Sequence, residues 1–255
     1  MLIAGFGKYL IHGASVRGPL HVKMDIPCQD AMAFKIISPE VAVIAIADGL
    51  GSAAKSDVGS KVAVDAVVRA VEQSVVNKTP DEIDISLVAM QSIAEARAAL
   101  ENAASVSQCE LSDFGSTLIS IVLMNGTLAI AHIGDGSVIA RVDSELRIAS
   151  APGESEYTNE VKPLTAKDWL ENVRSTVLAN VRDVIAFTDG CQRAALKKSP
   201  EGYQPFGPFC LPILDYLRGA AEESDTTGEL ERFLFSEKLC INSDDDKTLV
   251  VINLK

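Results

Sequence analysis

The sequence has few of the residues from which nucleophilic and zinc sites are usually built. Its 255 residues include 3 histidines and 5 cysteines. They show no signature of a catalytic triad and no CxxC pair. Five single, scattered cysteines argue against a disulfide framework and against a zinc ribbon, and they predict a reducing, cytoplasmic location.

Positive charge is also scarce. The chain has 23 Lys and Arg residues against 35 Asp and Glu residues, which gives a formal net charge of -12. No basic cluster is present that could neutralise phosphates, so we expect neither a nucleic-acid partner nor an anionic membrane as partner. An acidic protein that handles phosphate would need cations.

Long hydrophobic runs are missing as well. The N-terminal stretch MLIAGFGKYLIHGASV is interrupted by Lys8 and His12, has no charged leader, and is too short to cross a bilayer. We expect it to form a first strand. We find no internal repeat, and 47% hydrophobic residues suffice for a full core. The chain is therefore predicted to form a single domain over residues 1–255.

The most informative stretch is VAVIAIADGLGS, residues 41–52. Its seven consecutive aliphatic residues predict a strand buried on both faces, which ends at Asp48 and a glycine-rich turn. The same pattern recurs at Asp135 and Asp189, and an acidic cluster at Asp244 to Asp246 opens the last aliphatic run. One such aspartate could simply cap a helix. Four strand-end carboxylates in one chain instead indicate a shared site.

The order of the predicted elements favours antiparallel sheets. Residues 31–37 and 41–47 are two strands whose short link enforces antiparallel pairing. Asn125-Gly126 predicts a hairpin, because these residues tolerate the positive φ angles of a two-residue turn. Further strands are expected over 137–142, 146–150, 184–187 and 248–253. We interpret residues 151–180, with two prolines and the one tryptophan, as a surface excursion.

Helices are predicted between these strands. One begins near Ser56, where the apolar period changes to helical spacing. A second is signalled by Thr79-Pro80-Asp81-Glu82, a typical capping sequence. Its expected buried residues are Ala89, Ile93, Ala96, Leu100 and Ala103. Two more helices are expected over 206–218 and 227–235.

Two chemical interpretations of the glycines at the end of residues 41–52 remain open. Residues 49–56, GLGSAAKS, match the phosphate-binding loop GxxxxGK[ST] except at Ala54, and Asp135 or Asp189 could then hold magnesium. That loop belongs to parallel βαβ units, which the tight links disfavour. The alternative is a site for hard cations such as Mg²⁺ or Mn²⁺, which want oxygen ligands. It uses every carboxylate and needs no protein nucleophile.

Five motifs in order resemble the type 2C family of metal-dependent serine/threonine protein phosphatases, in its bacterial form. They span nearly the whole chain, and together they are far more specific than any one alone. The motifs are Asp48-Gly49-Leu50-Gly51, Gly115-Ser116-Thr117, Gly134-Asp135-Gly136, Thr188-Asp189-Gly190 and Asp245-Asp246-Lys247-Thr248.

This resemblance implies an α+β fold of four layers, α-β-β-α, in which two mostly antiparallel sheets are flanked by antiparallel helix pairs. It implies two divalent cations, Mn²⁺ or Mg²⁺, with a third in bacterial members. Asp48 would bridge the two metals, Gly49 would lend its carbonyl, and Asp189 and Asp245 would be terminal ligands. Asp135 would hold the third metal with Asp189. Asp30 would orient metal-bound water. The excursion at 151–180 matches a variable flap near the cleft.

The sequence also departs from the family pattern. Gln29 stands where an acidic residue is usual. An S-x-x-G-x-x-H pattern places His21 where the family has an arginine that grips phosphate, so His21 is the predicted phosphate contact, with Arg17 or Lys23 as substitutes. An ordinary loop histidine is the alternative. Leu50 replaces a histidine that many eukaryotic members use as a proposed general acid. His132 and Cys191 are expected to be buried core residues.

The predicted function is hydrolysis of phosphoserine and phosphothreonine in proteins by in-line attack of a metal-bridging hydroxide. The partners would be phosphorylated protein substrates and a cognate kinase, and a monomer is the expected state. A catalytically weak, phosphatase-like module that binds a phosphorylated partner or a kinase is the second hypothesis, because Gln29 and His21 depart from the pattern. Binding of a nucleotide by residues 49–56 is the third.

Overall fold

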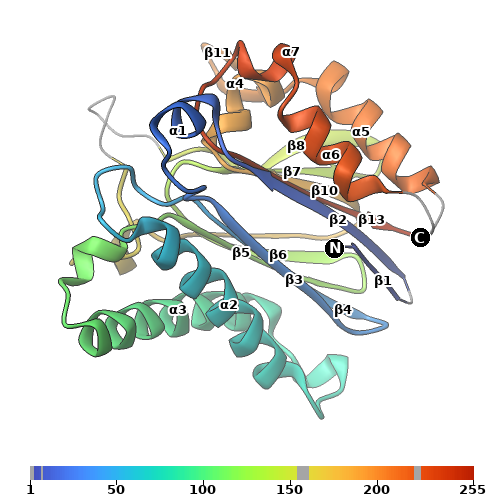
Figure 1. The fold of residues 1–255 in the computed structure, drawn as a ribbon. Coiled ribbons are helices and arrows are strands. Elements are labelled where there is room, and N and C mark those ends of the chain that lie inside the picture. Colours follow the sequence, from blue (N-terminus) through green and yellow to red (C-terminus); the bar gives the residue numbers. More distant parts are fainter. Residues whose placement is uncertain (1–2, 7, 154–160, 221–224) are drawn as a thin grey trace.

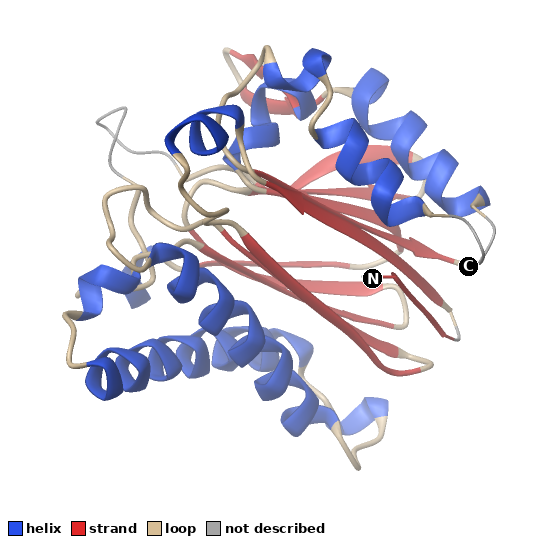
Figure 2. Cartoon of the chain, viewed as in Figure 1, coloured by secondary structure: helices blue, strands red, loops and turns tan. Residues whose placement is uncertain are grey.

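The computed structural model describes residues 3–6, 8–153, 161–220 and 225–255 (Figure 1). Two sheets pack face to face, and every strand pairing recorded within them is antiparallel. Helices lie outside both sheets, and loops gather at the end of the sandwich where the short helix α1 lies (Figure 2). The predicted four-layer α+β fold is confirmed.

Each sheet combines strands from distant parts of the chain. The six-stranded sheet has the order β1 (Ile3–Phe6), β2 (Tyr9–Val16), β13 (Lys247–Leu254), β10 (Val181–Phe187), β7 (Ser137–Val142) and β8 (Glu145–Ser150). The five-stranded sheet has the order β3 (Ala31–Ser38), β4 (Val41–Ala47), β5 (Leu118–Met124), β6 (Thr127–Ile133) and β9 (Arg174–Leu178). A separate hairpin joins β11 (Leu196–Ser199) and β12 (Gly202–Pro205).

The helices form the two outer layers. α2 (Ser56–Val75) and α3 (Ile85–Ser107) cover the five-stranded sheet, and α5 (Gly207–Gly219), α6 (Thr226–Leu234) and α7 (Glu237–Cys240) lie over the other sheet (Figure 1). Two short helices, α1 (Pro19–Met24) and α4 (Gln192–Ala195), lie near the loop end. Single 3-10 turns occupy Pro80–Glu82, Leu111–Phe114, Trp169–Asn172 and Asp189–Cys191. In the described part of the chain, no helix is long and apolar enough to cross a membrane.

The packing explains why β4 is apolar throughout. Successive side chains of a strand point to opposite faces of a sheet, and both faces of β4 are covered. Its residues divide between the core beneath α2 and α3, with Val41, Val43, Ala45 and Ala47, and the core between the sheets, with Ala42, Ile44 and Ile46. A third core, with Phe187, Leu214 and Leu230, lies under α5 and α6.

The hairpin and the helices lie where the sequence predicts them, except that one helix begins later in the chain. Asn125 and Gly126 have φ angles of 50° and 78° and connect β5 to β6. The capping box at Thr79 and Glu82 is present, but it closes the 3-10 turn Pro80–Glu82. α3 begins only at Ile85, where the Asp84 side chain accepts hydrogen bonds from two backbone N–H groups. The capping pattern therefore placed the start of this helix too early.

Three other expectations need correction. The N-terminal stretch forms two strands, β1 and β2, because the chain turns back at Lys8. The connection before β3 contains α1, with Pro19 in its first turn. The excursion predicted over 151–180 includes β9, which pairs with β6 and completes the five-stranded sheet. Residues 154–160 of that excursion lie outside the described residues.

Candidate metal centre

Four of the predicted site aspartates lie at strand ends that the two sheets bring together. Asp48 follows β4, Asp189 follows β10, Asp135 lies between β6 and β7, and Asp245 precedes β13. All four line one cavity of about 320 Å³. The cavity is also lined by Leu20, His21, Gln29, Gly49, Leu50, Gly51, Thr117 and Val161. Asp48, Asp189 and Asp245 thus share one cavity, as the metal hypothesis requires.

The backbone around Asp48 is fixed from two sides. The N–H of Asp48 donates to Thr117 Oγ1 at 3.0 Å, and the N–H of Thr117 donates to the Asp48 carbonyl at 2.8 Å. The N–H of Gly49 donates to the Gln29 carbonyl at 3.1 Å. A Cβ on Gly49 would lie 2.8 Å from that carbonyl oxygen, too close for any other residue. Thr117 therefore both holds Asp48 and lines the cavity.

The clustered carboxylates raise one another's pKa values. Burial raises the pKa of Asp48 well above its usual range, and the charges of Asp30 and Asp189 add to the effect. Burial, followed by the charges of Asp135 and Asp245, raises the pKa of Asp189 to about 6. Burial also raises the pKa of Asp135. Such a cluster disfavours its own ionised form, and a bound cation would relieve this.

Asp30 lies behind this cluster and is almost fully buried. Its Oδ2 accepts hydrogen bonds from Thr188 Oγ1 at 2.7 Å and Thr248 Oγ1 at 2.8 Å. Burial raises its pKa well above the usual range, although both threonine bonds act in the opposite direction. The two hydroxyls fix the carboxylate and leave Oδ1 as its unpartnered oxygen.

The donor set fits a divalent cation such as Mg²⁺ or Mn²⁺. Three carboxylate oxygens of the site, Asp30 Oδ1, Asp135 Oδ1 and Asp189 Oδ1, are buried and have no hydrogen-bond partner among the described residues. An unpartnered buried oxygen is costly, and it is the ligand that a hard cation prefers. Asp135 and Asp189 line the cavity, and their unpartnered oxygens would be satisfied by cations and the waters that these ions carry.

Asp246, adjacent to the predicted ligand Asp245, has a different environment. Its Oδ1 accepts from the N–H of Gly18 at 2.6 Å, and its Oδ2 accepts from the N–H of Gln29 at 2.6 Å. His21 Nδ1 lies 2.9 Å from the same Oδ2. The sequence alone did not identify this role, because three partners from a distant segment create it.

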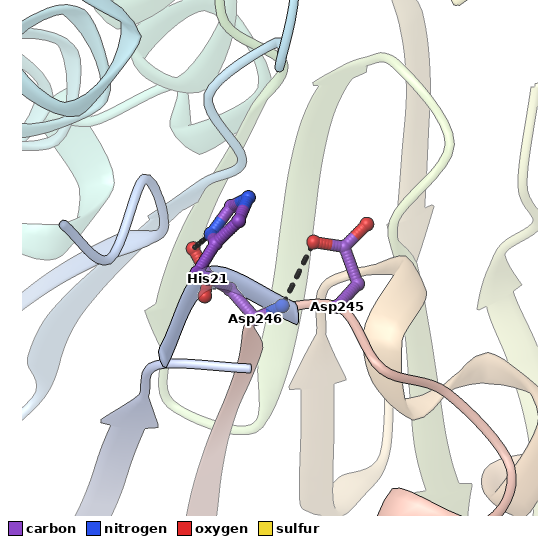
Figure 3. Close-up of side chains that lie close together, drawn as sticks. All are labelled: His21, Asp245 and Asp246. Atoms are coloured by element: carbon purple, nitrogen blue, oxygen red, sulfur yellow. Dashed lines mark hydrogen bonds and ion pairs between the residues drawn. The ribbon is translucent and has the colours of Figure 1, made fainter. Parts of the chain in front are cut away.

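In the described part of the chain, one group of histidine, cysteine or acidic side chains brings all its ligand atoms within 4.8 Å of one another. It consists of His21, Asp245 and Asp246 (Figure 3). Both oxygens of Asp246 already accept backbone N–H groups, so Asp246 is poorly placed to bind an ion as well. The carboxylate of Asp245 projects from the loop beside it, and its Oδ1 accepts the N–H of Asp246.

The three residues predicted as possible contacts for the substrate phosphate have different surroundings. His21 lines the cavity, whereas Arg17 donates to the Ile26 carbonyl at 3.2 Å and lies 3.7 Å from the exposed Asp25. Lys23 is exposed on α1 and does not line the cavity. Gln29 and Leu50 do line it. Within the described residues, no lysine or arginine lines this cavity.

Residues 49–56 do not have the environment of a nucleotide-binding loop. The N–H groups of Gly49 and Leu50 donate to protein carbonyls, and Lys55 lies over the Phe114 ring at 5.5 Å from its centre. A phosphate-binding loop needs such N–H groups free and needs a parallel βαβ unit. Among the described strands of the two sheets, all pairings are antiparallel.

His132 and Cys191 are core residues, as predicted. His132 is fully buried, and its Nδ1 lies 2.8 Å from Ser150 Oγ and 3.1 Å from Arg174 Nη2. Burial lowers its pKa well below the usual range. Cys191 is buried as well, and burial strongly raises the pKa of its thiol, which makes it an unreactive cysteine.

Thr188 and Thr248 were missed as site residues. Both belong to motifs noted in the sequence, Thr188-Asp189-Gly190 and Asp245-Asp246-Lys247-Thr248, but the motifs alone gave neither threonine a role. Only their convergence on one oxygen of Asp30 shows that role. In addition, the N–H of Thr248 donates to Thr188 Oγ1 at 3.0 Å, so the two threonines also join β10 to β13.

Sequence comparison identifies relatives over almost the whole chain. The family model described as "Protein phosphatase 2C" matches residues 17–234. "Serine/threonine-protein phosphatase 3" of Escherichia coli (strain K12) is 30% identical over 246 residues, which cover 93% of this chain and 95% of that protein.

Solved structures share the fold at low sequence identity. The serine/threonine phosphatase PstP/Ppp of Mycobacterium tuberculosis has a TM-score of 0.65 at 16% identity and covers 100% of both chains. The catalytic domain of PstP in complex with two manganese ions has a TM-score of 0.64 at 18% identity, over 97% of this chain and 98% of that one. Figure 1 shows the same layered arrangement of two sheets between helices in the present chain.

Proposed function

Because the chain belongs to the protein phosphatase 2C family, we propose that it is a metal-dependent phosphatase acting on phosphoserine and phosphothreonine in proteins. The observation that carries the proposal is the gathering of Asp48, Asp135, Asp189 and Asp245 around one cavity. Unpartnered, buried oxygens on several carboxylates of this site support it. The manganese ions of the related PstP structure support the choice of metal.

In this proposal Asp48 would be shared by two divalent cations, Mn²⁺ or Mg²⁺, and Gly49 would contribute its carbonyl oxygen. Asp189 and Asp245 would be terminal ligands, and Asp135 with Asp189 would hold a third cation. Cations held by these residues would supply an activated water, a hydroxide, for in-line attack on phosphorus. The close backbone packing at Gly49 and the bonds to Thr117 support the first two assignments, since they fix the ligand positions.

The remaining residues position the substrate and water. Asp30, held by two threonine hydroxyls, is placed to accept a proton from the attacking water through its free Oδ1. His21 is proposed to contact the substrate phosphate, because it is the basic side chain that lines the described cavity. Phosphorylated proteins would be the substrates, with a kinase of matching specificity as the opposing enzyme. The free cysteines support a reducing, cytoplasmic location for this single-domain protein.

A binding module without turnover is the second candidate. The observation in its favour is that the described cavity wall carries no lysine or arginine, so phosphate would be held weakly without cations. One assay separates the two functions. The protein is incubated with a phosphothreonine peptide and Mn²⁺, and released phosphate and bound peptide are both measured, with EDTA as the control. Manganese-dependent release supports the enzyme, and binding without release supports the module.

A further inference from the structure

His21 and Asp246 form a fixed pair in the wall of the cavity. Asp246 is 2% exposed, and His21 Nδ1 lies 2.9 Å from its Oδ2. The carboxylate cannot rotate freely, because the N–H groups of Gly18 and Gln29 donate to its two oxygens. A buried acceptor held in this way fixes the orientation of the ring that it contacts.

The helix that carries His21 is fastened to the same loop. The N–H of Leu20 donates to the Asp244 carbonyl at 3.0 Å, and Pro19 pre-sets the first turn of α1. The position of the ring is therefore set both through its backbone and through Nδ1. Figure 3 shows the second ring nitrogen on the side away from Asp246.

Nε2 is consequently the nitrogen that remains for chemistry. The ligand atoms of His21 and Asp245 lie within 4.8 Å of each other, so the ring is next to the proposed metal site. Nδ1 of His21 and Oδ2 of Asp246 form an ion pair at 2.9 Å. A carboxylate in this position orients the ring for acid–base chemistry at Nε2, as carboxylates do for histidines in other sites.

The reaction needs a proton donor near the oxygen that leaves phosphorus. A serine or threonine oxygen is a poor leaving group unless it receives a proton as its bond to phosphorus breaks. Leu50 cannot donate one, and the described aspartates of the cavity are proposed metal ligands. Thr117 Oγ1 is already an acceptor for Asp48. Of the described residues that line the cavity, His21 is the one with an uncommitted acid–base atom.

We propose that His21 is the general acid of the reaction and that Asp246 is the residue that positions its ring. This inference rests on the proposed phosphatase function and deepens it. The oxygen of water forms a bond to phosphorus while the bond from phosphorus to the side-chain oxygen breaks. The electron pair of the broken bond stays on the departing oxygen, which takes the proton from His21 Nε2. The ring regains a proton from solvent, and the products are the alcohol and inorganic phosphate.

A comparison of leaving groups tests this role. p-Nitrophenyl phosphate releases a stabilised phenolate that needs no proton, whereas a phosphothreonine peptide releases an alkoxide that does. His21→Asn places an amide nitrogen near the position of Nδ1, which preserves the contact with Asp246, but it removes Nε2. We expect kcat to fall by about 10²-fold or more on the peptide and to change little on p-nitrophenyl phosphate. Asp246→Asn should show the same selectivity to a smaller extent.

Controls separate this role from a structural one. Met24→Ala changes an exposed residue of the same helix and should alter neither activity. The rise in melting temperature with Mn²⁺ should be the same for His21→Asn and for the unmodified protein, which shows that the variant folds and binds metal. If His21→Asn proves unfolded, His21→Gln, which places its amide near Nε2, is measured in the same way.

Two results would overturn the role of His21. An equal loss on both substrates, expressed as a higher KM, would make His21 only a phosphate contact. Unchanged activity on both would remove it from the reaction. If the unmodified protein hydrolyses neither substrate with Mn²⁺, the proposed function itself fails, and the role of His21 fails with it.

Discussion

Asp48 and Asp189 lie close enough across the boundary between the two sheets for the charge of Asp189 to raise the pKa of Asp48. Asp48 follows β4 of the five-stranded sheet, and Asp189 follows β10 of the six-stranded sheet. The apolar core between the sheets therefore sets the distance between these side chains. Metal binding, sheet packing and the ionisation of the carboxylates should consequently depend on one another.

The metal-free protein should lose stability from Asp189 as the pH rises. Its pKa is raised to about 6, so the folded state binds this proton more tightly than the unfolded state does. This contribution is complete below the unfolded pKa, near 3.9, and is lost as the pH rises through about 6. Asp189→Asn does not titrate. In EDTA, its melting temperature relative to the unmodified protein should increase between about pH 4 and pH 7.

Manganese should reverse this effect. At about pH 7, Mn²⁺ should raise the melting temperature of the unmodified protein, and it should raise that of Asp189→Asn less. In EDTA, a difference in melting temperature between the two proteins that is constant with pH would show that the carboxylate cluster does not raise the pKa of Asp189.

Gly18 should be intolerant of a side chain. A Cβ at this position would overlap backbone atoms of Asp244 and Asp245, which cannot move without shifting the proposed ligand. Gly18→Ala should lower the free energy of unfolding by about 1–3 kcal/mol and should weaken Mn²⁺ binding. Gly219→Ala is the matched control, because no described atom lies within 4 Å of the Cβ that this substitution would add. Urea unfolding and a Mn²⁺ titration test both, and equal effects of the two substitutions would refute the close-contact explanation.

Arg174 should support the turn that carries Asp135. Its Nη2 donates to the Gly134 carbonyl at 2.7 Å and to the Ala151 carbonyl at 3.3 Å. Arg174→Ala would leave the Gly134 carbonyl without this donor, and we expect a loss of about 1–3 kcal/mol in the free energy of unfolding.

The control for this substitution is Arg147→Ala. Arg147 contacts Glu145 at 3.2 Å on the surface, and its loss should cost less than about 1 kcal/mol. Chemical denaturation of both variants gives the comparison. Equal stability of the two variants would show that the Arg174 bonds contribute little.

Thr248 should act through Asp30. Thr248→Val removes one of the two hydroxyls on Asp30 Oδ2, and it also removes the 2.7 Å contact with Ser15 Oγ. Loss of such a supporting bond typically reduces activity by about 10- to 100-fold. We expect this loss in kcat with little change in KM, and Thr248→Ser should retain most of the activity. A Ser variant as impaired as the Val variant would place the effect in packing.

Local patterns sufficed to predict many of the strands and the strand-end aspartates. Residues 41–47 are apolar throughout, and Asn125-Gly126 fixes a hairpin, so neither depends on distant contacts. The resemblance to the type 2C family predicted the layered fold, and the structure confirms it.

Features that depend on tertiary contacts could not be predicted. α1 has 6 residues and is held by the loop at Asp244 to Asp246, more than 200 positions away. β9 completes a sheet edge although its own residues alternate between half-buried and exposed. The role of Asp246 follows from three partners that no local pattern connects. In each case the contacts between distant segments, and not the local propensity, decide the structure.

Anomalous diffraction from crystals soaked in Mn²⁺ would show whether the cavity lined by Asp48 binds the metal. We expect manganese peaks in the cavity, with a carboxylate oxygen of Asp48 within about 2.0–2.3 Å of them and with Asp189 and Asp245 among the neighbouring ligands. Crystals of Asp48→Asn should lose these peaks while the fold is unchanged. Manganese bound only outside this cavity, or no peak beside Asp48 in the unmodified protein, would refute the proposed metal site.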